Sequence, residues 1–241
     1  MWGEVTLSAY PCSPHVTTCV QRTTTYAVSG MDGHGAGDDS AGRGLGDLYI
    51  TGDPEADGLL NRDGTALLIG MLLDQQVPME WAFAGPHKLA TRLGHLDAAR
   101  IAATSEDEFV AVCVAKPAIH RFPGSMGKRI HATCVILAER YGGRAENMWS
   151  DIDDAGELAR RLRTLPGYGE EKTRIFIALL AKRHGVRLDG WRDAAGKFGD
   201  DVPRSVADID GPESLAKVRD WKQEQKAAKR DKQDRPLSDG A

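Results

Sequence analysis

From Asp47 onward, apolar residues recur at intervals of three and four, the spacing that gathers them on one face of an α-helix. Asp53 followed by Pro54 predicts a helix start, because Asp accepts hydrogen bonds from first-turn N–H groups and Pro suits the first helical position. This helix is expected to continue through Leu67, Leu68, Met71 and Leu72 and to end near Val77.

The same spacing predicts further helices along the rest of the chain. No pair of segments shows the alternation expected of paired strands, and no repeat at solenoid spacing is present. We therefore expect an all-α fold, a compact multi-helix domain. Its further helices are expected at residues 79–93, 97–103, 105–115, 125–141, 154–164, 170–184, 191–196 and 212–231.

The two ends of the chain differ from this pattern. Residues 1–46 are rich in Thr, Ser, Gly and Asp, and such a segment buries too little apolar surface to offset the entropy of ordering it. We predict a disordered extension there, with Met31 or a later codon as the physiological start, which N-terminal sequencing would test. Residues 47–211 are then the helical domain. Residues 212–241 form a charged helix and tail, either a solvated face or an arm that contacts phosphates.

Composition excludes several classes of protein. The four cysteines, Cys12, Cys19, Cys113 and Cys134, include no CxxC pair, so neither a disulfide framework nor a zinc site is indicated and free thiols are expected. There is no apolar run of membrane-spanning length and no signal-peptide pattern. We expect a cytoplasmic protein with no membrane partner, no metal and no cofactor.

The distribution of charge changes the meaning of the net charge of −4. Residues 1–66 carry nine acidic and three basic residues, whereas residues 67–241 carry 28 basic and 26 acidic residues. Between Leu158 and Arg187 there are eight basic residues but only two acidic ones, Glu170 and Glu171. This segment is expected to form a basic patch, so the overall acidity does not exclude a nucleic-acid partner.

The basic segment also contains a predicted helical hairpin. Leu158, Leu162 and Leu165 share one helix face, and Ile175, Phe176, Leu179 and Leu180 line the opposing face of the next helix. Gly167 and Gly169 in the turn can take backbone angles closed to other residues and allow close approach of a ligand to the N–H groups. With the start of the second helix, these groups form an anion site suited to a DNA phosphate. An ordinary helix–turn–helix corner is the alternative.

The order Leu165-Pro166-Gly167-Tyr168-Gly169, a polar pair, Lys172-Thr173 and an apolar helix resembles the helix-hairpin-helix of the HhH-GPD base-excision DNA glycosylases, in particular the endonuclease-III-like members. The resemblance covers roughly residues 67–195. It implies two packed helical lobes and a monomer that binds double-stranded DNA containing a damaged or mismatched base, nucleoid-associated if bacterial. It also implies that Leu165, Pro166, Gly167, Tyr168, Gly169, Lys172 and Thr173 contact the DNA.

Two further positions match the family's site residues. Gln75 and Gln76 resemble the Gln pair that ends an early helix, where a Gln enters the duplex beside the extruded nucleotide. A polar helix end is the alternative. Asp189 lies twenty residues after Gly169, where the family carries its catalytic aspartate, although Leu188-Asp189-Gly190-Trp191 departs from the usual Val-Asp-Thr-His. Capping of the helix that begins at Trp191 is the alternative role.

Two departures limit what the resemblance implies. Bifunctional members carry a nucleophilic lysine at the position of Glu171, and a shift of one residue to Lys172 rotates the side chain by about 100°. We therefore expect no lyase activity and a phosphate-facing or solvated Lys172. No cysteine follows Cys134, so an iron–sulfur cluster is not expected.

The expected activity is hydrolysis of an N-glycosidic bond through an oxocarbenium-like sugar, with Asp189 as the carboxylate that stabilises it. Trp81, Phe83, Tyr168 and Trp191 are either stacking surfaces for a flipped base or core residues, and His120 and Arg121 either contact DNA or lie on a loop surface. Two other functions stay open: a non-catalytic DNA-binding or lesion-sensing protein, and a helical domain unrelated to DNA.

Overall fold

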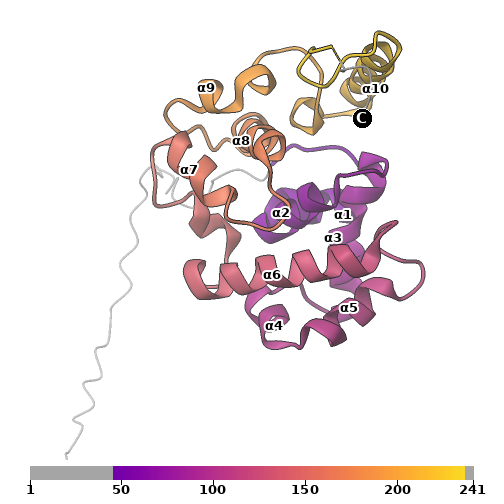
Figure 1. The fold of residues 1–241 in the computed structure, drawn as a ribbon, viewed down its shortest axis with the longest axis vertical. Helices are drawn as coiled ribbons and strands as arrows, with labels where there is room; N and C mark the ends of the chain where they lie inside the picture. The colour runs from indigo at the N-terminus through magenta and orange to yellow at the C-terminus, as the bar shows by residue number, and fades with distance from the viewer. Residues whose placement is uncertain (1–45, 237–241) are drawn as a thin grey trace, which may run out of the picture. The chain divides into compact units, whose positions relative to one another are not determined.

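The computed structural model describes residues 46–236, so the predicted disordered extension lies outside the described residues except for Gly46. The described part is helical and contains no strand, only isolated bridges, which confirms the all-α prediction for these residues. Its α-helices, shown in Figure 1, are α1 (Pro54–Arg62), α2 (Gly64–Leu73), α3 (Met79–Leu93), α4 (Ala98–Ala103), α5 (Glu106–Val114), α6 (Pro123–Tyr141), α7 (Ala155–Leu162), α8 (Glu170–Arg183), α9 (Trp191–Ala195) and α10 (Pro212–Ala227). Short 3-10 helices are η2 (Ala145–Met148), η3 (Gly196–Gly199) and η4 (Val206–Asp208).

Local capping explains why most helix bounds lie close to the predicted ones. The Asp53 side chain accepts a hydrogen bond from the Glu55 N–H at the start of α1. Ser105 and Glu108 form a reciprocal capping box at the start of α5. Helices α3 and α6 end at glycines in the left-handed conformation, Gly94 and Gly142.

The helix predicted from Pro54 to about Val77 is wrong in its continuity and in its end. Asp63 has extended backbone angles, donates its N–H to the Leu59 carbonyl and accepts the Ala66 N–H with its side chain. One residue therefore caps the end of α1 and the start of α2. Helix α2 ends at Leu73, leaving residues 74–78 as a loop.

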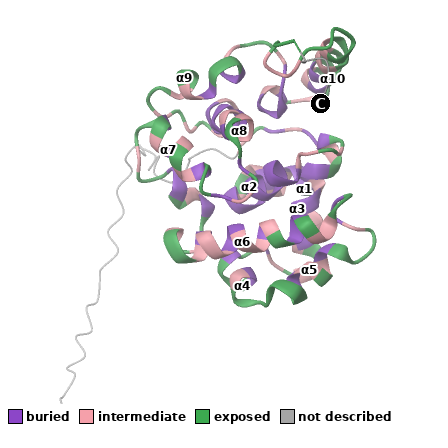
Figure 2. Cartoon of the chain, in the orientation of Figure 1, coloured by how far each residue is buried: buried purple, intermediate pink, exposed green. Residues whose placement is uncertain are grey.

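Helix α2 is the centre of the molecule. All ten of its residues are buried, and Figure 2 shows it coloured as buried along its length. It packs against α1, α3, α6 and η2 on the side formed by the earlier part of the chain, and against α8 from the later part. Helix α8 is in turn surrounded by α7, α9, η3 and η4. The polypeptide that follows α2 is thus placed where these two groups of helices meet.

The C-terminal helix is less solvated than its sequence suggests. Leu215 and Val218 of α10 are buried, and α10 packs on η4. Within the described residues, no helix is long and apolar enough to cross a membrane. Cys113 and Cys134 are free and buried, and burial raises the pKa of each thiol to about 12, whereas Cys12 and Cys19 lie outside the described residues.

Candidate nucleic-acid interface

Helices α7 and α8 form the predicted hairpin. Leu158, Leu162 and Leu165 are buried on one side of it and Ile175 and Phe176 on the other. Gly167 has φ +84°, a value that favours glycine, and the Cβ of any other residue there would lie 2.7 Å from Leu72 Cδ1. Gly169, in contrast, has extended angles of −79° and −179°, which residues with side chains also adopt.

The turn presents backbone donors that the protein itself does not use. Gly169 is the N-cap of α8 and supplies no side-chain cap, and Gly167 and Gly169 are both exposed. Among the described residues, no hydrogen bond uses the N–H of Gly167 or of Gly169. Together with the first turn of a 14-residue helix, these donors can hold an anion through backbone hydrogen bonds and the positive end of the helix dipole.

Three predicted DNA contacts are instead core side chains. Leu165 is buried, and the Tyr168 hydroxyl donates to the Leu68 carbonyl at 2.8 Å while its ring packs edge-on against Phe176. Thr173 is 1% exposed. These side chains cannot reach a ligand on the surface because they fix the hairpin to α2 and to the core of the hairpin. Pro166, Gly167 and Gly169 are the parts of the turn that remain accessible.

Lys172 is neither solvated nor phosphate-facing, which corrects the prediction. Its Nζ donates to the carbonyls of Met71 at 2.8 Å and Leu72 at 2.6 Å, in the last turn of α2. These carbonyls lie in the last turn of α2, where few N–H groups follow to bond them, so the ammonium group caps α2 together with the Asp74 N–H, which also reaches the Met71 carbonyl. Burial lowers the pKa of Lys172 from 10.5 to about 8, although the charge of Asp74 acts in the opposite direction.

The lowered pKa of Lys172 predicts a pH-dependent stability. Between pH 8 and 10.5 the unfolded chain binds more protons at this lysine than the folded chain, so the free energy of unfolding should rise with pH in this window. We expect the stability of the wild type relative to Lys172→Gln to increase by roughly 2 to 3 kcal/mol across it. Urea unfolding at several pH values measures this difference. Lys128→Gln is the control, because Glu106 raises the pKa of the exposed Lys128. A flat difference for Lys172→Gln would contradict the prediction.

The two glutamines of the loop that follows α2 differ in exposure. Gln75 is half-buried and its Nε2 lies 3.0 Å from the Sδ of the buried Met126, so its amide is engaged within the protein rather than free for a DNA contact. Gln76 is exposed and has φ +56°, a strained value for a residue with a side chain. A strained conformation of this kind persists only where the surrounding contacts hold the backbone in place. Strained residues occur most often at functional sites.

One of these contacts comes from His120. The Phe122 N–H donates to His120 Nδ1 at 3.0 Å, so Nε2 carries the proton and donates to the Gln75 carbonyl at 3.0 Å. Burial lowers the pKa of His120, which keeps the imidazole neutral as this pair of hydrogen bonds requires. The neutral ring therefore links the loop after α2 to the loop before α6, and His120 is a buried linker rather than a surface residue.

Exposed aromatic side chains flank His120 on both sides. Trp81 is 37% exposed and Phe122 is 44% exposed, and their ring centroids lie 6.4 and 6.0 Å from that of His120. The Arg121 guanidinium lies 5.3 Å from the Phe122 ring. These rings offer an exposed aromatic surface around His120, which bonds the carbonyl of Gln75, the residue before Gln76, whereas Phe83 is wholly buried.

Arg129 is a further candidate residue, which the sequence pattern did not indicate. A Cβ at Gly167 would lie 3.6 Å from Arg129 Cδ and Nη1, so this side chain runs beside the hairpin turn. Its charge helps to lower the pKa of Lys172, and no carboxylate among the described residues pairs with it. In the sequence, the indication of its position is its spacing, because Arg129 follows the buried Met126 by about one turn of α6.

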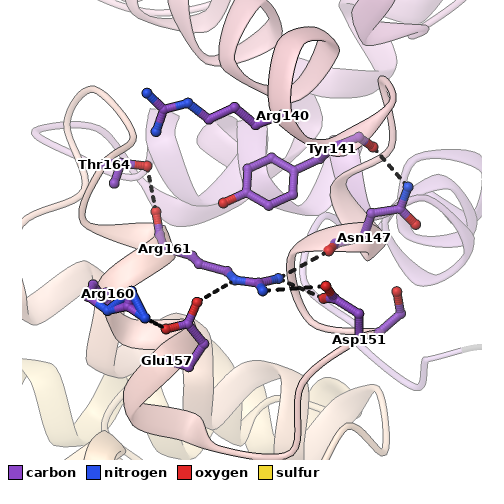
Figure 3. Close-up of a pocket in the computed structure, with 9 residues that line it drawn as sticks. Arg140, Tyr141, Asn147, Asp151, Glu157, Arg160, Arg161 and Thr164 are labelled. Carbon is purple, nitrogen blue, oxygen red and sulfur yellow. Dashed lines mark hydrogen bonds and ion pairs between the residues drawn. The ribbon is translucent and has the colours of Figure 1, made fainter.

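The predicted basic patch is mostly an ion-paired framework. Figure 3 shows Arg161 between Glu157 and Asp151, with Arg160 also paired to Glu157. Arg174 pairs with Glu170, Lys182 with Asp208, and Arg183 with Asp47 and Asp210. Three of these six acidic partners, Asp47, Asp208 and Asp210, lie far away in the sequence. Among the described residues, Arg163 and Arg187 have no carboxylate partner, which leaves much less free positive charge than the sequence suggests.

Asp189 does not lie with the other predicted site residues. It is exposed, and its backbone pairs with the start of α7 through Asp189 N–H to Asp153 O at 2.6 Å and Ala155 N–H to Asp189 O at 3.0 Å. The eight residues of α7, about 12 Å of helix, separate this bridge from the hairpin turn. Asp189 does not cap α9 either, because Gly190 is its N-cap. Asp189 therefore lies at the opposite end of α7 from the hairpin turn.

The interface that the structure brings together thus consists of the accessible hairpin turn, Gln76, Arg129, and the aromatic pair Trp81 and Phe122. They come from the hairpin, the loop after α2, α3 and α6, and hydrogen bonds from Tyr168 and Lys172 attach the hairpin to α2, the helix that precedes Gln76. Comparison of the whole chain with protein-family models, with curated proteins and with solved structures finds no match.

Proposed function

We propose that this protein is a base-excision DNA repair protein with a helix-hairpin-helix fold of the HhH-GPD type, and that it is a monofunctional DNA glycosylase. The observation that carries the proposal is the junction at the end of α2. There a hairpin turn with unused backbone donors packs against the same helix whose next loop exposes the strained Gln76.

Each part of this junction is suited to one step in binding a DNA duplex and extruding a nucleotide from it. The turn and Arg129 bind phosphates of one strand without reading sequence. Gln76 enters the base stack, where an amide offers both donors and acceptors to the orphaned base. Trp81 and Phe122 supply exposed aromatic faces beside it. The extruded nucleotide then loses its damaged or mispaired base by hydrolysis.

The position of Asp189 favours a second candidate function. A protein that keeps the hairpin and Gln76 but has no carboxylate at the extruded nucleotide would bind lesions without excising them. This candidate is a non-catalytic lesion-sensing protein.

Two measurements on the purified protein test the proposal. Binding of labelled duplexes at a series of salt concentrations should show a strong salt dependence, with a slope of about −0.9 for each phosphate contacted. Single-turnover incubation with duplexes that each carry one damaged or mismatched base should release the base from at least one of them. Binding without base release favours the lesion-sensing protein, and weak binding with no salt dependence rejects both functions.

We expect no lyase activity. The Nζ of Lys172 is held by two α2 carbonyls, and a Schiff base needs a free neutral amine at the sugar. Borohydride treatment of the protein with an abasic-site duplex should therefore trap no covalent adduct. An adduct that forms in the wild type and is lost in Lys172→Gln would contradict this prediction.

A further inference from the structure

A pocket of about 430 Å³ lies between the loop after α2 and helix α10 with the chain that follows it. This volume is within the usual range for small-ligand pockets. Gln76 contributes to its wall, so the pocket opens directly beside the residue proposed to enter the duplex. Its lining consists of Asp74, Gln75, Gln76, Val77, Pro78, Met79, Glu80, Arg219, Lys222, Gln223 and Lys232.

The lining combines an apolar wall with a cation that has no strong partner. Val77, Pro78 and Met79 form the apolar part. The Lys222 Nζ donates to Met79 Sδ at 3.1 Å, and a thioether is a weak acceptor. Arg219, in contrast, is occupied by Glu80, with Nε 2.9 Å from Oε1. Lys222 is therefore the cation in this pocket that is most available to an anionic ligand.

Asp74 supplies the one carboxylate of the lining that is not engaged. It follows the last residue of α2, and its backbone N–H donates to the carbonyls of Gly70 and Met71. Burial lowers the pKa of both Lys172 and Lys222, and the negative charge of Asp74 acts in the opposite direction on each. Asp74 and Lys222 also line the same pocket, so the carboxylate lies in the neighbourhood of these ammonium groups. Among residues 46–236, however, no hydrogen bond or ion pair reaches this carboxylate. A carboxylate that is held near cations but bound to none is accessible to a substrate.

We propose that Asp74 is the catalytic carboxylate, and that the nucleotide extruded beside Gln76 enters this pocket. Its phosphate lies toward Lys222, its base lies against Val77 to Met79, and its anomeric carbon faces Asp74. This assignment rests on the proposed glycosylase function and replaces Asp189 as the carboxylate that acts on the sugar.

The reaction is a hydrolysis with no redox step. The bond between C1′ and the base nitrogen breaks, and its electron pair leaves with the base while Asp74 stabilises the positive charge that develops on the sugar. Water then adds to C1′ and gives a proton to Asp74, and that proton passes to the departing base. The products are a free base and an abasic sugar, and Asp74 returns to its ionised form.

The test compares Asp74→Asn with Asp220→Asn in the full-length protein. Asp220 is exposed on α10, next in sequence to Arg219, and is a matched loss of one carboxylate outside the pocket. Single-turnover base release and duplex affinity are measured on the lesion that the wild type excises fastest. We expect Asp74→Asn to lose at least about 100-fold in base release while it keeps or gains affinity, and Asp220→Asn to lose neither.

Chemical rescue distinguishes catalysis from a structural role. In Asp74→Ser the shortened side chain leaves space for formate, and added formate should restore base release in proportion to its concentration. A carboxylate that only stabilises the fold would show no rescue and a lowered thermal midpoint. Asp74→Ser also serves as the test variant if Asp74→Asn does not fold.

The possible results distinguish failure of the Asp74 assignment from failure of the proposed glycosylase function. If the wild type excises a base and folded Asp74→Asn keeps more than about a tenth of the rate, Asp74 is not catalytic although the glycosylase stands. A concurrent loss in Asp189→Asn would return the role to Asp189. If the wild type binds duplexes but releases no base from any lesion, the glycosylase function fails, and the catalytic role of Asp74 fails with it.

Discussion

Gly169→Val should retain the fold and lose about 10-fold or more in affinity for duplex DNA. Its backbone angles suit a β-branched residue, and no atom lies within 4 Å of the position that a Cβ would occupy. The new side chain would cover the N–H groups at the start of α8 and keep a phosphate from reaching them. Loss of hydrogen bonds to a charged group costs about 1.5 to 3 kcal/mol. The measurement is fluorescence anisotropy with a labelled duplex, with a thermal melt of each variant.

Gly211→Val is the matched control for this experiment. Gly211 is also an N-cap glycine with extended angles and open space around it, but it begins α10 rather than α8. Its replacement should leave DNA affinity unchanged. Equal affinities for the two variants would remove the hairpin turn from the DNA interface.

Gly167→Ala should lower the free energy of unfolding by about 2 to 5 kcal/mol. A left-handed conformation costs a residue with a side chain roughly 1 to 2 kcal/mol, and overpacking in a filled region adds roughly 1 to 3 kcal/mol. Both costs arise here, because φ is +84° and the Cβ would lie 2.7 Å from Leu72 Cδ1. Urea unfolding followed by circular dichroism measures the loss.

Two other glycines separate these contributions. Gly190 has φ +68° and open space around it, so Gly190→Ala should show the backbone cost alone. Gly169→Ala has neither cost and should change stability by less than about 0.5 kcal/mol. If Gly167→Ala is no more destabilising than Gly190→Ala, the close packing of the turn on α2 is not an energetic feature of the hairpin.

The sequence predicted the helices well where their ends depend on neighbouring residues. The Ser105 capping box, the left-handed Gly94 and Gly142, and the turn at Gly167 are all local features, and each ended or started a helix near the predicted residue. Asp63 was the exception. A single aspartate can cap two successive helices only if the chain bends there, and apolar spacing on both sides of it reads as one continuous helix.

The candidate site was predicted in outline but not in its side chains. Gln76, Gly167 and Gly169 are exposed, so their predicted contacts with DNA stay a prediction, whereas Leu165, Tyr168 and Thr173 are buried. The basic segment gave a misleading picture of the surface charge, because Lys182 and Arg183 pair with carboxylates brought to them from other parts of the chain, Asp208, Asp210 and Asp47. A count of the charges in one segment cannot reveal ion pairs with residues that are distant in the sequence.

What the sequence determined by itself was therefore the helical class, the order of the helices and the place of the turn. Tertiary structure alone decided that Lys172 caps α2, that His120 joins two loops, and that Asp74 shares a pocket with Lys222 of α10. The physical reason is the range of the forces involved. Caps and helical periodicity act within about one or two turns of the chain. Burial, pairing of charges and the lining of a pocket depend on which distant segments pack together.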